Sequence, residues 1–387
     1  MVYKENTTLL NKLTLVNPTY NRQDFALRLM RYWSGREPRV IIIDGSNESI
    51  PAQQLSNLDS NISYYHIPEN IVTRIGKVLN LIDTEYVALI ADDEFHLPGA
   101  LHKSIEWLEI RTDYVACMGR AMGFGIDEDG KVIGHIAYPD HKGYEITNTD
   151  PASRMLKHMR HYTPSTIYSV VRSKEWINSF KAYVAKEFPI YAIGELQFEL
   201  SICYFGKSII LPYLHWLRSS ENIPNPEEHL KHPDKDISLN PGNQFYLCWS
   251  SPTKKEFREE FLKITSETLA KTDGRDIKIV SDEVERAMDA YAELSMNWDS
   301  AILSNGLKPK IKTLLKKYLP LALKVPHALR TILSATDGTG KPKSLISSAK
   351  DIERGGVLVD YEALKEIENI VFEFHQKKFK SPTQNCC

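Results

Sequence analysis

Three consecutive carboxylates, Asp92, Asp93 and Glu94, directly follow an apolar stretch at 86–90. That stretch is typical of a buried strand in a mostly parallel sheet. Carboxylates at a strand end repel one another, so folding alone gives little reason to place them together. Mg²⁺ or Mn²⁺ would offset the repulsion, because these cations bind one or two carboxylates plus substrate phosphate oxygens. We expect a metal-bound phosphate at this sheet edge, with a solvated acidic loop as the alternative.

The composition is that of an ordinary globular protein. The chain has 387 residues, of which 42% are hydrophobic and 25% charged, with a net charge of −2. This balance gives no global argument for binding nucleic acid or a membrane. The five cysteines are irregularly spaced and form no C-x-x-C pair, so neither a zinc site nor a disulfide framework is indicated.

The sequence gives no sign of export or of membrane insertion. The first residues contain no long apolar core of the signal-peptide kind, and no apolar run approaches the ~18 residues typical of a membrane span. We therefore expect a protein that is made and kept in the cytoplasm.

Strand and helix patterns alternate through the first hundred residues. Apolar runs predict the strands, and apolar residues three or four positions apart predict the helices. The expected strands are 13–16, 40–43, 62–67 and 86–90, and the expected helices are 25–33, 71–82 and 98–108. Such an alternation predicts an α/β fold, with a parallel sheet and right-handed crossovers.

The middle of the chain is more mixed, and its end is helical. An Asp-Gly pair between 114–119 and 131–136 predicts a hairpin turn rather than a calcium loop. The further elements that we expect are helices at 151–161, 193–204, 280–296 and 360–377, and strands at 165–171 and 208–212. The chain is therefore expected to divide into an α/β domain at 1–240 and a mainly helical region at 241–387.

Five short motifs follow one another in the expected α/β domain. They are Pro18-Thr19-Tyr20-Asn21-Arg22, Asp44-Gly45-Ser46, the helical set Arg74, Lys77 and Asn80, then Ala91-Asp92-Asp93-Glu94, and Gly194-Glu195. In this order they resemble the motifs of GT-A nucleotide-sugar glycosyltransferases, in particular the inverting, family-2-like branch. The resemblance covers roughly residues 12–220 and implies the GT-A fold, a Rossmann-like and mostly parallel sheet flanked by helices. It would make 1–240 the catalytic domain.

The resemblance implies a donor site at the ends of the first two strands. Five residues would surround a uracil-type base and its ribose: Pro18, Thr19, Tyr20, Arg22 and Asp44. Asp44 would accept hydrogen bonds there, although the motif that it begins also suits a simple strand-ending turn. Arg74 or Lys77 would neutralise the diphosphate. A solvated helix face is the alternative for both.

The resemblance also implies Mn²⁺ or Mg²⁺ at the acidic triplet, where the family has its Asp-x-Asp motif. Asp93 is the ligand that we expect first, with Asp92 and Glu94 next, and Asp92 would also approach the donor. The register of the motif stays open, because its first position can fall on Ala91. The cation would stabilise the departing nucleoside diphosphate. His215 would be a third ligand or a phosphate contact, with a packed histidine as the alternative.

Inversion at the anomeric carbon needs a base that takes the proton of the acceptor hydroxyl. The resemblance implies Glu195 for this role, because it follows Gly194 at the start of a helical segment. The chain departs from the family at Leu196, where an aspartate is common. Glu199 is the alternative acid, unless it belongs to the exposed face of the helix.

A basic and apolar stretch at 306–333 contains no acidic residue. It would lie on an anionic membrane surface, or pack as a helical layer with its lysines in water. Its three prolines, Pro309, Pro320 and Pro326, argue against one continuous amphipathic helix. The helical region as a whole would serve acceptor binding, membrane docking or homo-oligomerisation.

The resemblance implies a metal-dependent, inverting glycosyltransferase that uses a nucleoside-diphosphate sugar, with UDP as the expected carrier. The acceptor would be a hydroxyl of a saccharide or of a lipid-linked saccharide, and no nucleic-acid partner is expected. A non-catalytic module that binds sugar nucleotides or glycans is the first alternative, because fold does not secure activity. The second is a nucleotidyltransferase, although the loop at 17–22 lacks the glycines typical of that class.

Overall fold

A ten-stranded sheet runs through the computed structural model, which describes residues 7–188, 193–221, 241–303 and 342–380. The strands are β1 (Leu13–Thr19), β2 (Arg39–Asp44), β3 (Ile62–His66), β4 (Tyr86–Leu89), β5 (Phe95–His96), β6 (Tyr114–Ile126), β7 (Val132–Ile136), β8 (Glu145–Ile146), β9 (Val170–Arg172) and β10 (Lys207–Ser219). Their order in the sheet is β3-β2-β1-β4-β9-β6-β10-β5, with β7 beside β6 and β8 beside β10.

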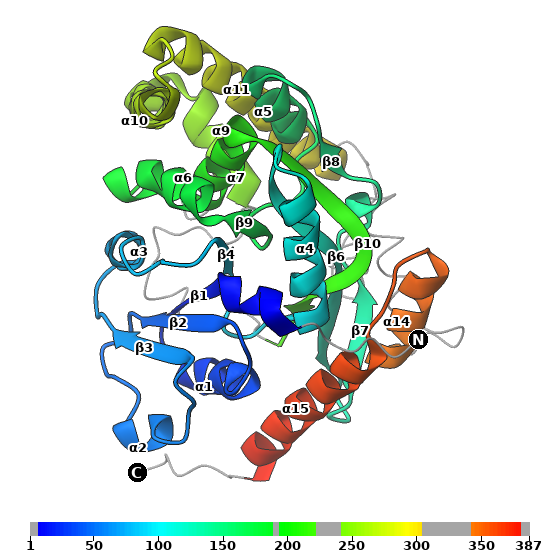
Figure 1. Cartoon of the computed structure of the whole chain (residues 1–387). Coiled ribbons are helices and arrows are strands. Elements are labelled where there is room, and N and C mark those ends of the chain that lie inside the picture. The colour runs from blue at the N-terminus through cyan, green and yellow to red at the C-terminus, as the bar shows by residue number, and fades with distance from the viewer. Residues whose placement is uncertain (1–6, 189–192, 222–240, 304–341, 381–387) are drawn as a thin grey trace.

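Helices cover both faces of this sheet (Figure 1). They are α1 (Gln23–Trp33), α2 (Ala52–Leu55), α3 (Ile71–Val78), α4 (Pro98–Ile110), α5 (Pro151–Arg160), α6 (Ser173–Ala185), α7 (Ile193–Phe205), α9 (Pro241–Ser250), α10 (Lys255–Asp273), α11 (Ile277–Leu303), α14 (Leu345–Arg354) and α15 (Tyr361–Lys380). Three short 3₁₀ segments lie at Thr7–Lys12, Pro139–His141 and Pro252–Lys254.

Strands β1 to β4 pair in parallel, which confirms the α/β fold expected from the alternating patterns. Strand β2 shows why its sequence is apolar without interruption. Val40 and Ile42 pack with α1 and α4 on one face, whereas Ile41 and Ile43 pack with α3 and α6 on the other. A strand that is buried on both faces needs apolar residues at every position. The parallel strands lie between two layers of helix, and their carboxyl ends meet at one edge of the sheet.

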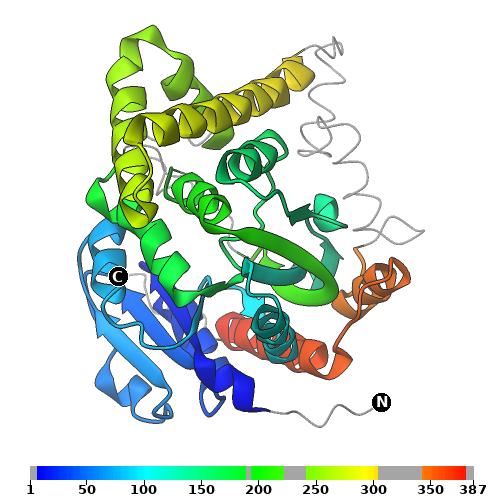
Figure 2. The same ribbon diagram turned by 45° about the horizontal axis from the view of Figure 1, so that its top comes forward.

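The described helices beyond residue 240 pack in two separate places. Helices α9, α10 and α11 join α5 and α7 in one apolar cluster, and they lie together at the top of Figure 1. Helices α14 and α15 instead pack beside β7 and α1, in the main core of the sheet. Leu358, between these two helices, exchanges backbone hydrogen bonds with Pro212 and Leu214 of β10. Figure 2 shows the same separation from another side.

The strand expected at 165–171 is wrong over most of its length, because β9 covers only Val170–Arg172. The backbone amides of Ser165, Thr166 and Ile167 donate to the buried Glu199 carboxylate, at 3.1, 3.0 and 2.8 Å. They are therefore not available to a strand ladder. Burial raises the pKa of Glu199, but hydrogen bonds from His158 and Thr166 outweigh burial, so the net pKa lies below its usual value.

Two other features differ from the sequence-based expectations. Strands β6 and β10 each extend well beyond the predicted segments, and they pair with each other over irregular register shifts. Helix α6 was not predicted, although Trp176, Phe180 and Tyr183 recur at helical spacing and pack in one cluster. The hairpin is confirmed, because Gly130 has a φ of 77° at the turn between β6 and β7. The stretch 306–333, with its expected membrane contact, lies outside the described residues.

Glu199→Gln tests the structural role of the Glu199 carboxylate. The substitution is expected to lower the free energy of unfolding by about 3 kcal/mol, because buried amides lose a charged acceptor. The native pKa of Glu199 is lowered, so its stabilisation is present above the ordinary carboxyl pKa and is lost as the pH falls. Urea unfolding at neutral pH measures the difference. Glu267→Gln, at an exposed position of α10, is the matched control, and equal unfolding midpoints for both variants would contradict this role.

Candidate active site

The acidic triplet lies in a turn that is fixed to the end of β1. The backbone N–H of Ile90 donates to the carbonyl of Val16 at 2.9 Å, and the Asn17 side chain donates to the carbonyl of Ile90 at 2.8 Å. The chain then turns, with the N–H of Glu94 donating to the carbonyl of Ala91. These bonds hold the carboxylates at the carboxyl edge of β1 and β4, the edge at which α/β sheets bind ligands.

Asp92 and Asp93 share the guanidinium of Arg22. The Nη1 atom of Arg22 lies 3.1 Å from Asp92 Oδ1, and its Nη2 atom lies 2.6 Å from Asp93 Oδ2. Thr19 donates its hydroxyl to the other oxygen of Asp92 at 2.7 Å. Burial raises the pKa of Asp92 to about 6, although Arg22 and Thr19 act to lower it. Two carboxylates thus lie against one cation, and the pair keeps excess negative charge.

Glu94 points to a different partner. Its carboxyl accepts a 2.6 Å hydrogen bond from the indole N–H of Trp216 on β10. Burial raises the pKa of Glu94 to about 8, and the neighbouring Asp93 charge adds to this effect. The triplet is therefore divided: Asp92 and Asp93 form one pair, and Glu94 faces the aromatic side chains of β10.

The first two sequence motifs meet at the same edge. Asp44 accepts from the amide of Ser46 at 2.8 Å and from the Tyr64 hydroxyl at 2.8 Å. Ser46 also receives the amide of Asn21, which has a φ of 55° in the loop after β1. Tyr20, between the two strands' ends, is 50% exposed and is available to a ligand. The sheet edge thus combines a fixed acid with an exposed aromatic ring.

The two basic residues expected at the diphosphate already have protein partners in this structure. Arg74 is buried and donates to the carbonyls of Thr19 and Ile43, at 2.5 and 2.9 Å. A Cβ atom at Gly45 would lie only 2.6 Å from the Arg74 guanidinium carbon, so a larger residue there would displace the guanidinium from its two carbonyls. Lys77 is exposed and lies 2.9 Å from Glu69. In this geometry Arg74 supports the loop backbone, and Lys77 belongs to a solvated helix face.

Glu195 lies in the first turn of α7 and accepts a hydrogen bond from the Tyr162 hydroxyl. Burial raises its pKa above the ordinary value. Glu199, one turn later, is fully buried and its oxygens are occupied by backbone amides and by His158 at 3.0 Å. Glu195 is therefore the better placed of the two acids to exchange a proton with a substrate.

Tyr138 and Arg218 connect the acidic triplet with Glu195. Burial raises the pKa of Tyr138 to about 12, and the charges of Glu94 and Glu195 both contribute. The positive charge of Arg218 acts on the same two carboxyls in the opposite direction. The Tyr138 ring stacks on Trp216 with centroids 5.4 Å apart, and the Arg218 guanidinium lies 5.3 Å from its centre. The charge of Arg218 thus acts on both acids, and Arg218 and Trp216 contact the same tyrosine ring.

Two side chains of this region, Tyr138 and Trp216, were not singled out from the sequence. Trp216 follows His215, which was expected from the sequence to lie at the metal or the phosphates. Because neighbouring residues of a strand point to opposite faces, Trp216 faces the acidic triplet and His215 does not. The period of β10 was the available signal, and the short predicted strand at 208–212 hid it. Tyr138 lies between β7 and the 3₁₀ segment Pro139–His141, where no periodic pattern marks it.

His215 is packed in the interior and does not join the carboxylates. Its ring is fully buried, and its centroid lies 5.2 Å from that of His96. Burial holds its pKa well below the usual value. In the described ranges, no three His, Cys, Asp or Glu side chains are grouped to hold a metal ion.

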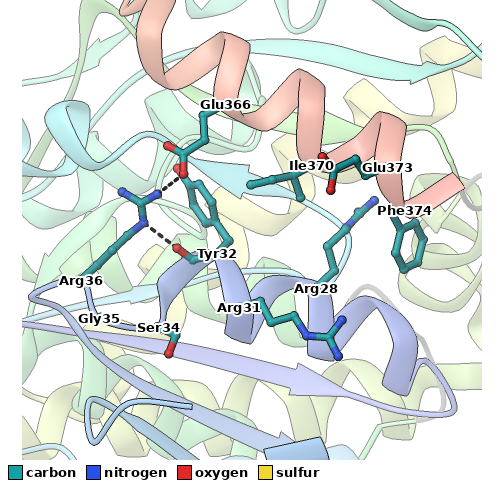
Figure 3. A pocket seen from close by; sticks show the side chains of 10 residues that line it. All are labelled: Arg28, Arg31, Tyr32, Ser34, Gly35, Arg36, Glu366, Ile370, Glu373 and Phe374. Atoms are coloured by element: carbon teal, nitrogen blue, oxygen red, sulfur yellow. Dashed lines mark hydrogen bonds and ion pairs between the residues drawn. The ribbon is translucent and has the colours of Figure 1, made fainter. Parts of the chain in front are cut away.

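A cavity of about 420 Å³ lies outside this site, between α1 and α15 (Figure 3). It contains none of the expected site residues. Its lining residues are Arg28, Arg31, Tyr32, Ser34, Gly35, Arg36, Glu366, Ile370, Glu373 and Phe374. Of the helices that the structure describes, none is both long and apolar enough to cross a membrane.

Comparison with known proteins places residues 14–169 in the family model described as glycosyl transferase family 2. Among solved structures, the chain is similar to S. aureus TarS 1–349, with 11% identity and a TM-score of 0.42, over 76% of this chain and 93% of that one. The same TarS fragment in complex with UDP-GlcNAc has 12% identity and a TM-score of 0.41, over 74% of this chain and 91% of that one. The mannosyltransferase PcManGT from Pyrobaculum calidifontis, in complex with GDP-Man and Mn²⁺, has 12% identity and a TM-score of 0.36, over 84% of this chain and 86% of that one. No curated protein matches the sequence.

Glu94→Gln tests the burial of the Glu94 carboxyl. In the native state its pKa is about 8, above the ordinary 4.5, so the folded chain holds a proton that the unfolded chain releases within this window. The contribution of Glu94 to stability is therefore full below the lower value and falls as the pH rises to about 8. Urea unfolding at pH 5 and pH 8 should show that wild type loses a few kcal/mol relative to Glu94→Gln. A constant difference between the two proteins would contradict the buried, protonated carboxyl.

Proposed function

We propose that this glycosyltransferase of GT-A fold inverts the configuration at the anomeric carbon of the donor sugar and depends on a divalent metal. The proposal starts from residues 14–169, which match the glycosyl transferase family 2 model. The proposed donor is a nucleoside-diphosphate sugar, with UDP as the first candidate. The proposed acceptor is a hydroxyl of a saccharide or lipid-linked saccharide. The observation that carries the proposal is the pair Asp92 and Asp93 at the carboxyl end of β4. The family match argues against both alternatives, a nucleotidyltransferase and a non-catalytic module.

The carboxylate pair fits a hard cation. Asp93 is 8% exposed and Asp92 3%, so both lie close enough to the surface for a ligand and far enough from water to keep their charge unscreened. Oxygen donors of this kind suit Mn²⁺ or Mg²⁺. When bound, the cation would supply Lewis-acid stabilisation of the leaving diphosphate. Asp93 is the proposed first ligand because its carboxylate is the less buried of the two.

The proposed donor site uses the loop after β1 and the end of β2. Tyr20 is exposed enough to stack on the nucleoside base, and Asp44 keeps the neighbouring loop in shape through Ser46 and Tyr64. Arg22 offsets part of the charge of the carboxylate pair, a role that a bound cation would take over. The guanidinium is then free to bind a phosphate oxygen, which suits its planar donors.

Glu195 is the proposed base. As the acceptor oxygen bonds to the anomeric carbon, the bond from that carbon to the diphosphate oxygen breaks, and the hydroxyl proton passes to Glu195. The Tyr162 hydroxyl orients the Glu195 carboxylate, and burial brings its pKa closer to neutral. The ring of Tyr138 stacks on both Trp216 and His141, and the Arg218 guanidinium lies 5.3 Å from its centre, so this ring is part of the wall behind Glu195 rather than a free face for the sugar.

Asp93→Asn and Glu195→Gln test the two central roles. A thermal-shift screen of UDP- and GDP-linked sugars with Mn²⁺ first identifies the donor, since a bound ligand raises the unfolding temperature. With that donor, each variant is expected to lose about 100-fold or more of the transfer rate, because each removes a charged group from the reaction. Asp93→Asn should also lose the Mn²⁺-dependent thermal shift, whereas Glu195→Gln should keep it. Full activity of either variant would refute its assigned role, and Glu267→Gln is the control.

Arg22→Gln tests whether the guanidinium and the metal compete for the carboxylate pair. The variant removes a positive charge that lies about 3 Å from both carboxylates. Without nucleotide, it is expected to bind Mn²⁺ about tenfold more tightly, since the cation no longer has to displace a charged partner. Titration followed by Mn²⁺ electron paramagnetic resonance measures the affinity. Unchanged or weaker binding would show that Arg22 does not occupy the proposed metal position.

A further inference from the structure

Arg28 of α1 is a buried arginine directly behind the acidic triplet. It is 3% exposed, and its Nη2 atom donates to the backbone carbonyl of Asp93 at 2.9 Å. The side chain of Asp93 meanwhile lies against Arg22. One arginine thus binds the backbone of this residue and another binds its carboxylate.

Arg28 is connected to the C-terminal helix through Glu221. The Glu221 carboxylate accepts two 2.7 Å hydrogen bonds from the Arg28 guanidinium, in the paired geometry that is strongest for these groups. His375 of α15 lies 2.6 Å from the same carboxylate through its Nε2 atom. Burial acts to raise the pKa of Glu221, but hydrogen bonds from Arg28 and His375 outweigh it and lower the net pKa. The carboxylate is therefore ionised and offsets the Arg28 charge.

Aromatic rings enclose the Arg28 guanidinium on three sides. Its central carbon lies 4.9 Å from the ring centre of Phe25, 5.1 Å from that of Phe95 and 4.6 Å from that of Phe374. Phe374 belongs to α15, and Figure 3 shows Arg28 extending toward it at one end of the cavity. The rings exclude water, so the ionic contacts of Arg28 are stronger than at a surface.

We propose that Arg28 is a positioning residue for the acidic loop at 91–94, and that α15 holds Arg28 in place through His375 and Glu221. The inference rests on the function proposed above, because this loop then carries the metal ligand Asp93. Arg28 donates to the loop backbone, and its own ionic partner is Glu221 rather than Asp92 or Asp93. The negative charge of the Asp92 and Asp93 pair thus stays available to a cation. The C-terminal helix shapes the donor site without touching the donor.

His375→Ala is the first test, with hydrogen exchange of the full-length chain as the readout. The loop has protected amides to report on, because the N–H groups of Ile90, Glu94 and Leu97 donate to backbone carbonyls. The variant is expected to speed exchange in 90–97 by about fivefold, since it removes a hydrogen bond to a charged group. His375→Gln retains an N–H donor for Glu221 and should restore slow exchange. Arg28→Lys keeps the charge but loses the paired geometry, and should exchange faster than wild type.

Asn369→Ala, at an exposed position of α15, is the matched control and should leave exchange unchanged. The Mn²⁺ concentration for half-maximal transfer should rise about fivefold in His375→Ala, in parallel with local exchange, while the KM for the acceptor stays the same. A general loss of stability would instead speed exchange across the whole sheet and change both constants, and this result overturns the positioning role. Unchanged exchange at 90–97 in both His375→Ala and Arg28→Lys also overturns it, even if transfer is normal. Local acceleration without any Mn²⁺-dependent transfer would overturn the proposed function alone.

Discussion

The contact of Arg22 with Asp92 and Asp93 is the interaction on which the rest of the site depends. Two carboxylates at a strand end repel each other, and a single guanidinium offsets only part of their charge. Burial raises the pKa of Asp92 to about 6, so the ionised form of this carboxyl is destabilised in the folded protein. The chain tolerates the excess charge because hydrogen bonds from β1 fix the loop. A cation bound together with a diphosphate would offset the remaining negative charge at this edge of the sheet.

The surrounding elements can be understood as supports for that pair. Parallel strands, buried on both faces, bring the ends of β1, β2 and β4 to one edge. Arg74 fixes the backbone of this edge, and Arg28 fixes the loop from behind. The indole N–H of Trp216 donates to Glu94, so Glu94 has a different partner from the Asp92 and Asp93 pair. Three arginines thus have three different tasks, and only Arg22 lies against the carboxylate pair itself.

The sequence predicted the parts of the fold that periodicity governs. The β1 to β4 strands and their helices follow from apolar patterns, and so does the position of the acidic triplet. The loop at 165–169 could not be predicted, because Glu199 captures its amides from another element. The roles of Arg74 and His215 could not be predicted, because they depend on whether each side chain points into the protein or toward the site. Both side chains point inward and are buried. Arg28 and Glu221 lie 193 positions apart, and no local pattern announces such a pair.

A crystal structure with Mn²⁺ and a nucleoside diphosphate, UDP and GDP being tried in turn, would show whether a metal-bound diphosphate replaces Arg22 at the carboxylate pair. We expect an anomalous manganese peak within about 2.2 Å of an Asp93 oxygen, close to the usual metal–oxygen distance, with phosphate oxygens completing the shell. Arg22 should have left its position between Asp92 and Asp93. A manganese peak remote from Asp93, or a bound diphosphate with Arg22 still bridging the two carboxylates and no metal between them, would contradict it.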